Sequence, residues 1–229
     1  EKGQEPESFT KWKAQANEDW QPRFEDLRSQ EKRDVYAALL QEQGYLCCYC
    51  MIRITNSNNS AQAGNEDSDP CHIEHLKPQE KFPQLDLDYN NLLASCKAEQ
   101  SKTNPPPPSR CGYKKDNWYD EKLLVSPLQP DCESFFRYSI TGEIMPVADP
   151  EKHTAAQATI ERLGLNLDRL RDKRKRVMDD ILDIIDTLTD EEIDQLIQGL
   201  KKRNAQGQYE PFSTAVVFVL QSSYTNSKK

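Results

Sequence analysis

Cysteine spacing constrains this chain more than any other feature of its sequence. Cys47 and Cys50 form a Cys-x-x-Cys pair, and Cys96 and Cys111 follow as a second, wider pair. A Cys-x-x-Cys turn presents two thiolates to one metal ion, and a closed structural zinc site needs four ligands in a tetrahedron. We therefore expect these four cysteines to hold a structural Zn²⁺, with the proline-rich segment before Cys111 looped out.

The other three cysteines, Cys48, Cys71 and Cys132, are expected to lie outside this site. The total of seven is odd, and the polar start of the sequence has no apolar signal-peptide core, so a disulfide framework is disfavoured. A lone Cys-x-x-Cys could also be a redox pair, and the second pair is what favours zinc. Because no apolar run approaches the ~18–20 residues of a membrane span, we expect a cytoplasmic protein without a membrane partner.

The stretch His72-Ile73-Glu74-His75 lies between the two cysteine pairs and carries residues suited to hydrolysis. Cleavage of a phosphodiester needs a base that deprotonates water and a metal ion that stabilises charge. His75 is the candidate base, because a neutral imidazole can accept a proton near neutral pH. Glu74 offers the oxygen ligand that Mg²⁺ or Mn²⁺ prefers. Successive side chains of a strand point to opposite faces, so both can serve one site only where the backbone bends or is irregular.

The order of these motifs resembles the HNH endonuclease family: Cys-x-x-Cys, Glu-His, Asn-Leu-Leu, a cysteine, and a closing cysteine followed by lysines. Further stretches are similar to the PtuB-type HNH subunits of Septu-type and retron-associated anti-phage defence systems. These stretches are residues 81–96, 135–137, 142–144 and 161–166. The specific motifs cover about residues 45–117, and a weaker resemblance continues to about residue 176.

This resemblance implies an α+β fold with a ββα-metal core, held by structural zinc and embedded in mainly α-helical N- and C-terminal segments. It implies a metal-dependent endonuclease that cleaves DNA, with RNA as the alternative substrate. His75 would be the base, and Glu74 would hold the catalytic Mg²⁺ or Mn²⁺. Asn91 corresponds to the middle residue of the family motif, which orients the base, and Asn90 is the competing choice for that role.

One position departs from the family pattern. HNH proteins often place His or Asn directly after the last cysteine as a further metal ligand, and this chain has Gly112 there. Asp116 or Asn117, expected within the same helix, could supply the ligand instead, and Lys115 matches a lysine that often follows in the family.

Three other residues near the motif keep two interpretations each. His72 is either a second residue of the metal site or an exposed strand residue, and we favour the second. Lys77 and Lys81 could contact phosphate, although solvated lysines are the simpler interpretation.

The formal net charge of −8 argues against strong nucleic-acid binding by the isolated chain, because phosphate contacts supply most of such affinity. The dense basic run at residues 169–176 is followed at once by acidic residues, so we interpret both as solvated helix surfaces. The acidic balance and Gly112 also fit an alternative function, a zinc-stapled nucleic-acid or protein-binding assembly subunit with a degenerate nuclease site.

A partner is expected to complete the activity. The chain has no Gly-rich phosphate loop ending in Lys-Ser or Lys-Thr, so any dependence on nucleotide must come from another protein. The resemblance implies an ABC-type ATPase subunit of the PtuA type, which would gate the nuclease within a defence complex.

We expect three segments along the chain: an arm and helix at 1–44, the HNH core with two loop insertions at 45–150, and a helical, partner-binding region at 151–229. Hydrophobic periodicity predicts helices over 23–43, 154–163, 166–186 and 190–203. Thr154, Asn166 and Thr189 are the expected caps, with a capping box between Thr189 and Glu192. Residues 212–222 form a helix or strand that either closes its own core or docks on another chain. Loops are expected over 55–70 and 98–110.

Overall fold

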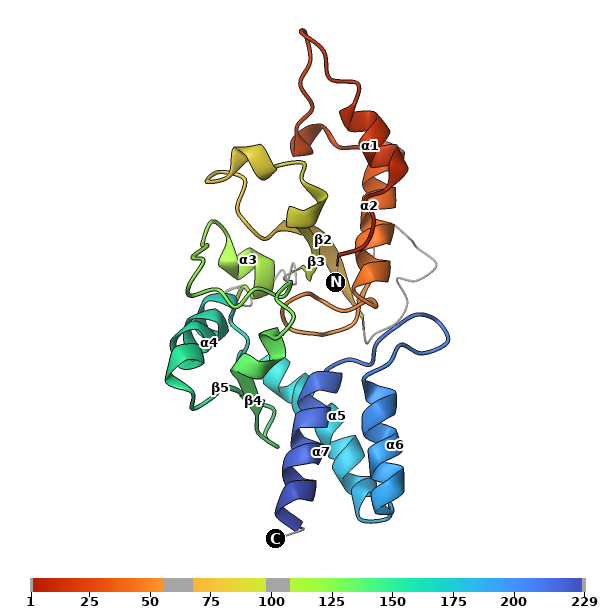
Figure 1. Cartoon of the computed structure of the whole chain (residues 1–229), viewed down its shortest axis with the longest axis vertical. Coiled ribbons are helices and arrows are strands. Elements are labelled where there is room, and N and C mark those ends of the chain that lie inside the picture. The colour runs from red at the N-terminus through yellow and green to blue at the C-terminus, as the bar shows by residue number, and fades with distance from the viewer. Residues whose placement is uncertain (1, 56–67, 98–107, 228–229) are drawn as a thin grey trace.

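The computed structural model describes residues 2–55, 68–97 and 108–227. The helices are α1 (Glu7–Lys13), α2 (Ser29–Glu42), α3 (Cys111–Lys115), α4 (Pro150–Leu163), α5 (Asp168–Ile185), α6 (Asp190–Leu200) and α7 (Ser213–Ser227). The strands are β1 (Ile54–Thr55), β2 (Asp69–His75), β3 (Leu92–Cys96), β4 (Phe136–Tyr138) and β5 (Ile144–Pro146). Figure 1 shows α1 and α2 at one end of the molecule, α5, α6 and α7 at the other, and the short strands between them. The expected α+β class is confirmed.

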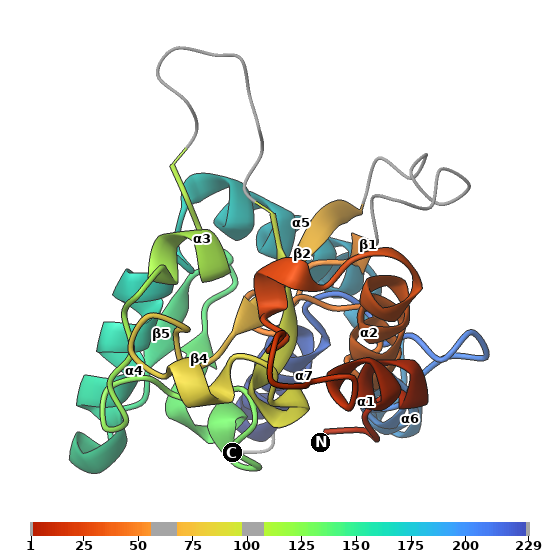
Figure 2. The ribbon, with the colours of Figure 1, turned by 90° about the horizontal axis from the view of Figure 1, so that it is seen from above.

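The candidate site is built on a small sheet in the middle of the chain. β2 and β3 pair antiparallel, with His75 opposite Leu92 and Cys71 opposite Cys96, and β1 lies parallel to β2 at the edge. α2 and α3 both contact β3, and in Figure 2 they lie on different sides of the strand pair. The middle of the molecule therefore contains two antiparallel strands, β2 and β3, with the short helix α3 packed against β3.

Aromatic packing fixes the N-terminal arm. Phe9 is fully buried, its ring stacks on Trp12 at 6.0 Å between centroids, and Trp12 in turn meets Trp20 edge-on at 5.7 Å. The predicted helix at 23–43 begins later, at Ser29. The earlier residues form a 3-10 turn (Phe24–Asp26), because the Asp26 carboxylate accepts a hydrogen bond from the Arg23 N–H at 3.0 Å.

The C-terminal helices differ from the expectation mainly at their starts. α4 begins at Pro150, not at Thr154, since the Asp149 carboxylate caps it by accepting from the Glu151 N–H at 2.9 Å. Asn166 caps no helix, because its amide exchanges two hydrogen bonds, of 2.9 and 2.8 Å, with the Ile144 backbone of β5. The capping box of Thr189 and Glu192 at the start of α6 is confirmed.

The terminal apolar segment closes the chain's own core. It forms α7, and its apolar residues are largely buried against α5, α6 and β4. Those buried are Phe212, Val216, Val217, Val219 and Leu220. All three predicted segments contribute to one buried hydrophobic cluster. No helix among the described residues is both long and apolar enough to cross a membrane.

The basic run on α5 is not simply a solvated surface. Arg174 is buried and donates to the backbone oxygens of Gly142 at 2.7 Å and Leu165 at 2.5 Å. Lys173 approaches the buried carboxylate of Asp69 at 3.3 Å. Part of this positive charge therefore joins α5 to β2 and to the turn before β5, and the solvated interpretation is wrong for these two residues.

The two predicted loops are only partly described. Residues 56–67 and 98–107 lie outside the described residues. At the edge of the first loop the prediction is wrong, because β1 includes Thr55 and β2 already begins at Asp69. Residues 108–110 have no regular structure, as expected.

Candidate metal centre and nuclease site

The four predicted metal cysteines come together in one buried cluster. The sulfur atoms of Cys47, Cys50, Cys96 and Cys111 all lie within 4.8 Å of one another. Cys47 and Cys50 flank the turn after α2, Cys96 ends β3, and Cys111 begins α3 with a positive φ of 52°. The cluster thus ties three separate stretches of the chain at one point, and it could hold one metal ion.

The spacing and the charge of the sulfurs both fit a thiolate-bound cation. Zinc–sulfur bonds of about 2.3 Å in a tetrahedron place the sulfurs about 3.8 Å apart, and the Cys50 and Cys96 sulfurs are 3.8 Å apart. Burial raises the pKa of the Cys47 thiol, but hydrogen bonds from Cys111 and neighbouring thiols outweigh it and hold that pKa well below its usual range. Burial raises the pKa of Cys50 and of Cys111 well above theirs. Four thiolates can therefore share this space only around a cation.

A second group of polar residues lines a pocket of about 460 Å³ beside the cluster. β2 contributes His72, Glu74 and His75, and α3 contributes Gly112 and Lys115. β2 ends at His75, the chain bends at Leu76 and Lys77, and both Glu74 and His75 line the pocket. The proposed base and the proposed metal ligand are thus together.

His75 is held in the form that a base requires. Its side chain is 8% exposed, and Nε2 lies 2.9 Å from the backbone oxygen of Asp86. Since a carbonyl only accepts, Nε2 carries the hydrogen, and the neutral ring keeps its lone pair on Nδ1. Burial lowers the pKa of His75 below its ordinary value of 6.5, against the opposing effect of Asp86. The Phe24 ring packs edge-on against the imidazole, 4.5 Å between centroids.

Glu74 is a buried carboxylate with a different partner on each oxygen. Oε1 accepts from the Lys115 ammonium at 2.8 Å and from the Tyr49 hydroxyl at 3.2 Å. Oε2 lies 3.3 Å from Nε2 of His72. Burial raises the pKa of Glu74, but His72 and Lys115 outweigh it, so the pKa is lowered and the group is ionised at neutral pH. His72, favoured above as an exposed strand residue, is instead mostly buried beside this carboxylate, with 19% of its side chain exposed.

Asn91 acts on the loop that carries the histidine's partner. Its side chain accepts from the Lys77 N–H at 2.8 Å and donates to the backbone oxygens of Lys77 at 3.0 Å and Leu85 at 3.2 Å. The expected direct contact with the imidazole comes instead from the Asp86 backbone. The competing candidate, Asn90, is exposed and bonds to Asp88.

The candidates for the missing ligand, Asp116 and Asn117, also line the Glu74 pocket. α3 ends at Lys115, so Asp116 and Asn117 lie beyond it, contrary to the expectation of one longer helix. Asp116 is exposed, and the Asn117 amide donates to the Glu80 carboxylate. Lys115 is almost fully buried and donates to Glu74 and, at 3.1 Å, to the backbone oxygen of His75.

Several contributors to the site carry no signal in the sequence. Phe24 and Tyr49 belong to segments far from the Glu-His pair, and Asp86 acts through its backbone. Lys77 packs over the rings of Phe82 and Tyr119, at 5.6 and 5.5 Å from the centroids. Lys81 is exposed and does not line the pocket.

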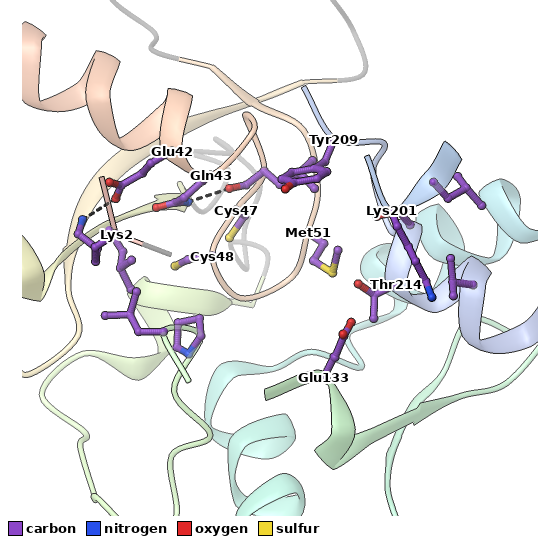
Figure 3. A pocket seen from close by; sticks show the side chains of 17 residues that line it. Lys2, Glu42, Gln43, Cys47, Cys48, Met51, Glu133, Lys201, Tyr209 and Thr214 are labelled. Atoms are coloured by element: carbon purple, nitrogen blue, oxygen red, sulfur yellow. Dashed lines mark hydrogen bonds and ion pairs between the residues drawn. The ribbon is translucent and has the colours of Figure 1, made fainter. Parts of the chain in front are cut away.

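Another pocket, of about 530 Å³, lies on the outer side of the Cys47 turn and reaches α7 (Figure 3). Its lining includes Glu42, which pairs with Lys2 at 2.5 Å, and Cys48. No described histidine lines this pocket, and of the two carboxylates in its described lining, Glu42 and Glu133, Glu42 is already paired with Lys2. We therefore place the chemistry at the Glu74 and His75 pocket.

Comparison with known proteins points to the same class. No family model matches the chain. It is 32% identical over 149 residues to a Vibrio cholerae serotype O1 biovar El Tor protein named as a candidate HNH endonuclease of retron Vc95, covering 62% of each chain. It is 27% identical over 172 residues to the Septu protein PtuB of Bacillus thuringiensis, covering 73% of this chain and 52% of that protein.

These matches confirm the resemblance to HNH proteins and, more narrowly, to PtuB. The chain spans between about half and three fifths of the length of these curated relatives, at 52% and 62%. The activity and partners of the whole protein are therefore treated as proposals.

Proposed function

We propose that this chain is a metal-dependent HNH endonuclease with a ββα-metal core, formed by β2, β3 and α3 and stapled by zinc at the four cysteines. One observation carries the proposal. A buried imidazole, fixed through one nitrogen by a backbone carbonyl, shares a pocket with an ionised carboxylate. A general base and a hard oxygen ligand are what phosphodiester hydrolysis requires.

Each group then has a defined part in the reaction. Nδ1 of His75 accepts a proton from the attacking water, while the Asp86 carbonyl keeps the ring oriented. Oε2 of Glu74 would hold the divalent ion, and Lys115 and Tyr49 hold the other carboxylate oxygen in place. A Mg²⁺ or Mn²⁺ ion bound there supplies charge stabilisation to the phosphate and the leaving oxygen. DNA is the proposed substrate, and RNA is the second to test.

Substitution of the base tests the mechanism. The His75→Ala variant should stay folded and lose cleavage by roughly 100-fold or more, the usual contribution of a general base. His153→Ala is the matched control, since His153 lies on α4 and contacts only the Val147 carbonyl among the described residues. Cleavage of labelled DNA and RNA with Mg²⁺, by chain and partner together, measures both. Undiminished cutting by the His75 variant would refute the mechanism.

We also propose that the chain acts as an anti-phage effector in complex with an ABC-type ATPase of the PtuA type. The support is the likeness to retron and Septu proteins and a net charge of −8, unsuited to binding nucleic acid alone. Co-purification with the product of a neighbouring gene that carries ATP-binding motifs should succeed, and cleavage should depend on the complex. A monomer that is fully active alone would refute this partnership.

A zinc-stapled assembly subunit without nuclease activity is the second candidate. Gly112, where the family often has a ligand, and the acidic charge favour it. A complex that binds its partner and nucleic acid yet never cuts, at any divalent ion tested, would support this alternative.

A further inference from the structure

We infer that His72 is a direct ligand of the catalytic divalent ion through Nε2, in place of the ligand that Gly112 does not provide. The inference rests on the proposed nuclease function, which assigns Glu74 to that ion. It adds a residue that the Glu-His motif does not include.

The geometry of His72 and Glu74 suits two neighbouring ligands of one ion. Both residues lie on β2 two positions apart, so their side chains share a face. Nε2 of His72 and Oε2 of Glu74 are 3.3 Å apart. Adjacent ligands of an octahedral ion with bonds of about 2.1 Å lie about 3.0 Å apart. A small adjustment would therefore place both atoms on a common Mg²⁺ or Mn²⁺.

The His72 ring has no other polar role among the described residues. Its Nδ1 is buried and finds no hydrogen-bond partner there. Its only ring neighbour of note is Tyr113, met edge-on at 4.6 Å between centroids. Here Glu74 is the one polar group that the imidazole meets, and Glu74 is the proposed ligand.

Gly112 explains why the imidazole can occupy this place. A Cβ on residue 112 would lie 2.7 Å from Nε2 of His72 and would also overlap Oε2 of Glu74. A side chain after the last cysteine and the observed His72 ring therefore exclude each other. The His72 imidazole, which comes from β2, therefore occupies the space that the family's ligand from α3 would fill.

The donor types on the site agree with this assignment. The carboxylate suits Mg²⁺ or Mn²⁺, and imidazole suits transition metals, so the pair favours Mn²⁺ at this site. The alternatives proposed from the sequence also line the pocket, but Asp116 is exposed and Asn117 already donates to Glu80.

Mn²⁺ bound to the untagged, zinc-loaded chain provides a test that does not depend on cleavage. Pulsed EPR detects coupling between Mn²⁺ and a coordinated ¹⁴N, and the chain has only three histidines that could supply it. We expect this coupling in the wild-type protein. It should disappear in His72→Gln and in His72→Phe, and it should remain in His75→Ala and His153→Ala. Calorimetry should show Mn²⁺ binding at least about tenfold weaker in both His72 variants, as loss of even indirect ligand support costs that much.

Zinc content and thermal stability identify folded variants, and His72→Phe keeps a ring against Tyr113. Unchanged Mn²⁺ affinity and persistent ¹⁴N coupling in either folded His72 variant would overturn the inference. So would a wild-type protein without such coupling. Failure of the nuclease function is a separate outcome, in which the wild-type complex does not cut although the coupling is present and depends on His72.

Discussion

The cysteine cluster and the Glu74 pocket are neighbouring sites built for opposite purposes. The four sulfurs are buried and lie within 4.8 Å of one another. The pocket beside them is open and charged, and each oxygen of its carboxylate already has a partner. The four sulfur donors fill the cysteine site, whereas the oxygen and nitrogen donors of the Glu74 pocket leave space for a ligand.

This difference suggests that the cysteine cluster stabilises the fold and that the neighbouring pocket serves the proposed reaction. A closed set of four thiolates leaves no position for a substrate, so it can only hold the fold. The open pocket, whose proposed use is catalytic, brings the buried polar groups of Glu74, Lys115 and His75 into one place. The comparison predicts that damage to the first site unfolds the chain and damage to the second changes its reactivity.

The largest effect is expected from Cys96→Ser. A structural zinc contributes about 10 kcal/mol or more to the folding of small metal domains, which is comparable to the whole stability of a typical domain. The variant should be insoluble or lack a cooperative thermal transition, as followed by circular dichroism. Elemental analysis of the wild-type chain should find one zinc per chain.

Cys132→Ser is the matched control, because Cys132 lies outside the four-sulfur group. It should melt within a few degrees of the wild type and keep its zinc. A stable, soluble Cys96→Ser protein, or a folded wild type without zinc, would contradict the assignment of this cluster to stability.

A smaller effect is expected from Lys115→Met, which sharpens the comparison inside the open site. Removal of the ammonium leaves the Glu74 carboxylate buried without its main cation, and breaking such a pair costs about 3 kcal/mol. Chemical denaturation should show this loss, and the pKa of Glu74 should rise. Lys114→Met is the control, since Lys114 is exposed. Equal stability of the two variants would show that the Lys115 pair contributes little.

The smallest effect concerns pH. His75 accepts a proton only when neutral, so cleavage should fall as the pH drops through its pKa. Because burial lowers that pKa below 6.5, the acidic limb of the rate profile should have its midpoint below 6.5. The charge of Lys115 also lowers this pKa, so Lys115→Met should move the midpoint upward. A wild-type midpoint above 6.5 would contradict the buried-base assignment.

Short motifs allowed the cysteine cluster and the Glu74 and His75 pair to be located from the sequence. Cysteine and histidine are uncommon residues, and their spacing in these motifs is typical of metal-binding and catalytic sites. The helical C-terminal region was also predictable, since its apolar periodicity is regular. The starts of α2 and α4 were missed because of local hydrogen bonds. Asp26 holds a 3-10 turn before α2, and Asp149 caps α4 before the predicted start.

Contacts between distant segments could not be read in advance. The Asp86 carbonyl that orients His75 is backbone and would be present for any residue at that position. The burial of Lys115 and Arg174 depends on what packs over them, and lysine and arginine in sequence usually indicate a solvated surface. The role of His72 required the knowledge that Gly112 leaves space beside Glu74.

The short helix α3 serves both sites, and this has a consequence for protein synthesis. Its first residue, Cys111, completes the sulfur cluster, and its last, Lys115, holds Glu74. Five residues are too few to form a stable helix alone. A nascent chain that has exposed His75 but not Cys111 therefore has no ordered reaction centre. If the proposed nuclease function holds, no cutting would begin until Cys111 and Lys115 have left the ribosome.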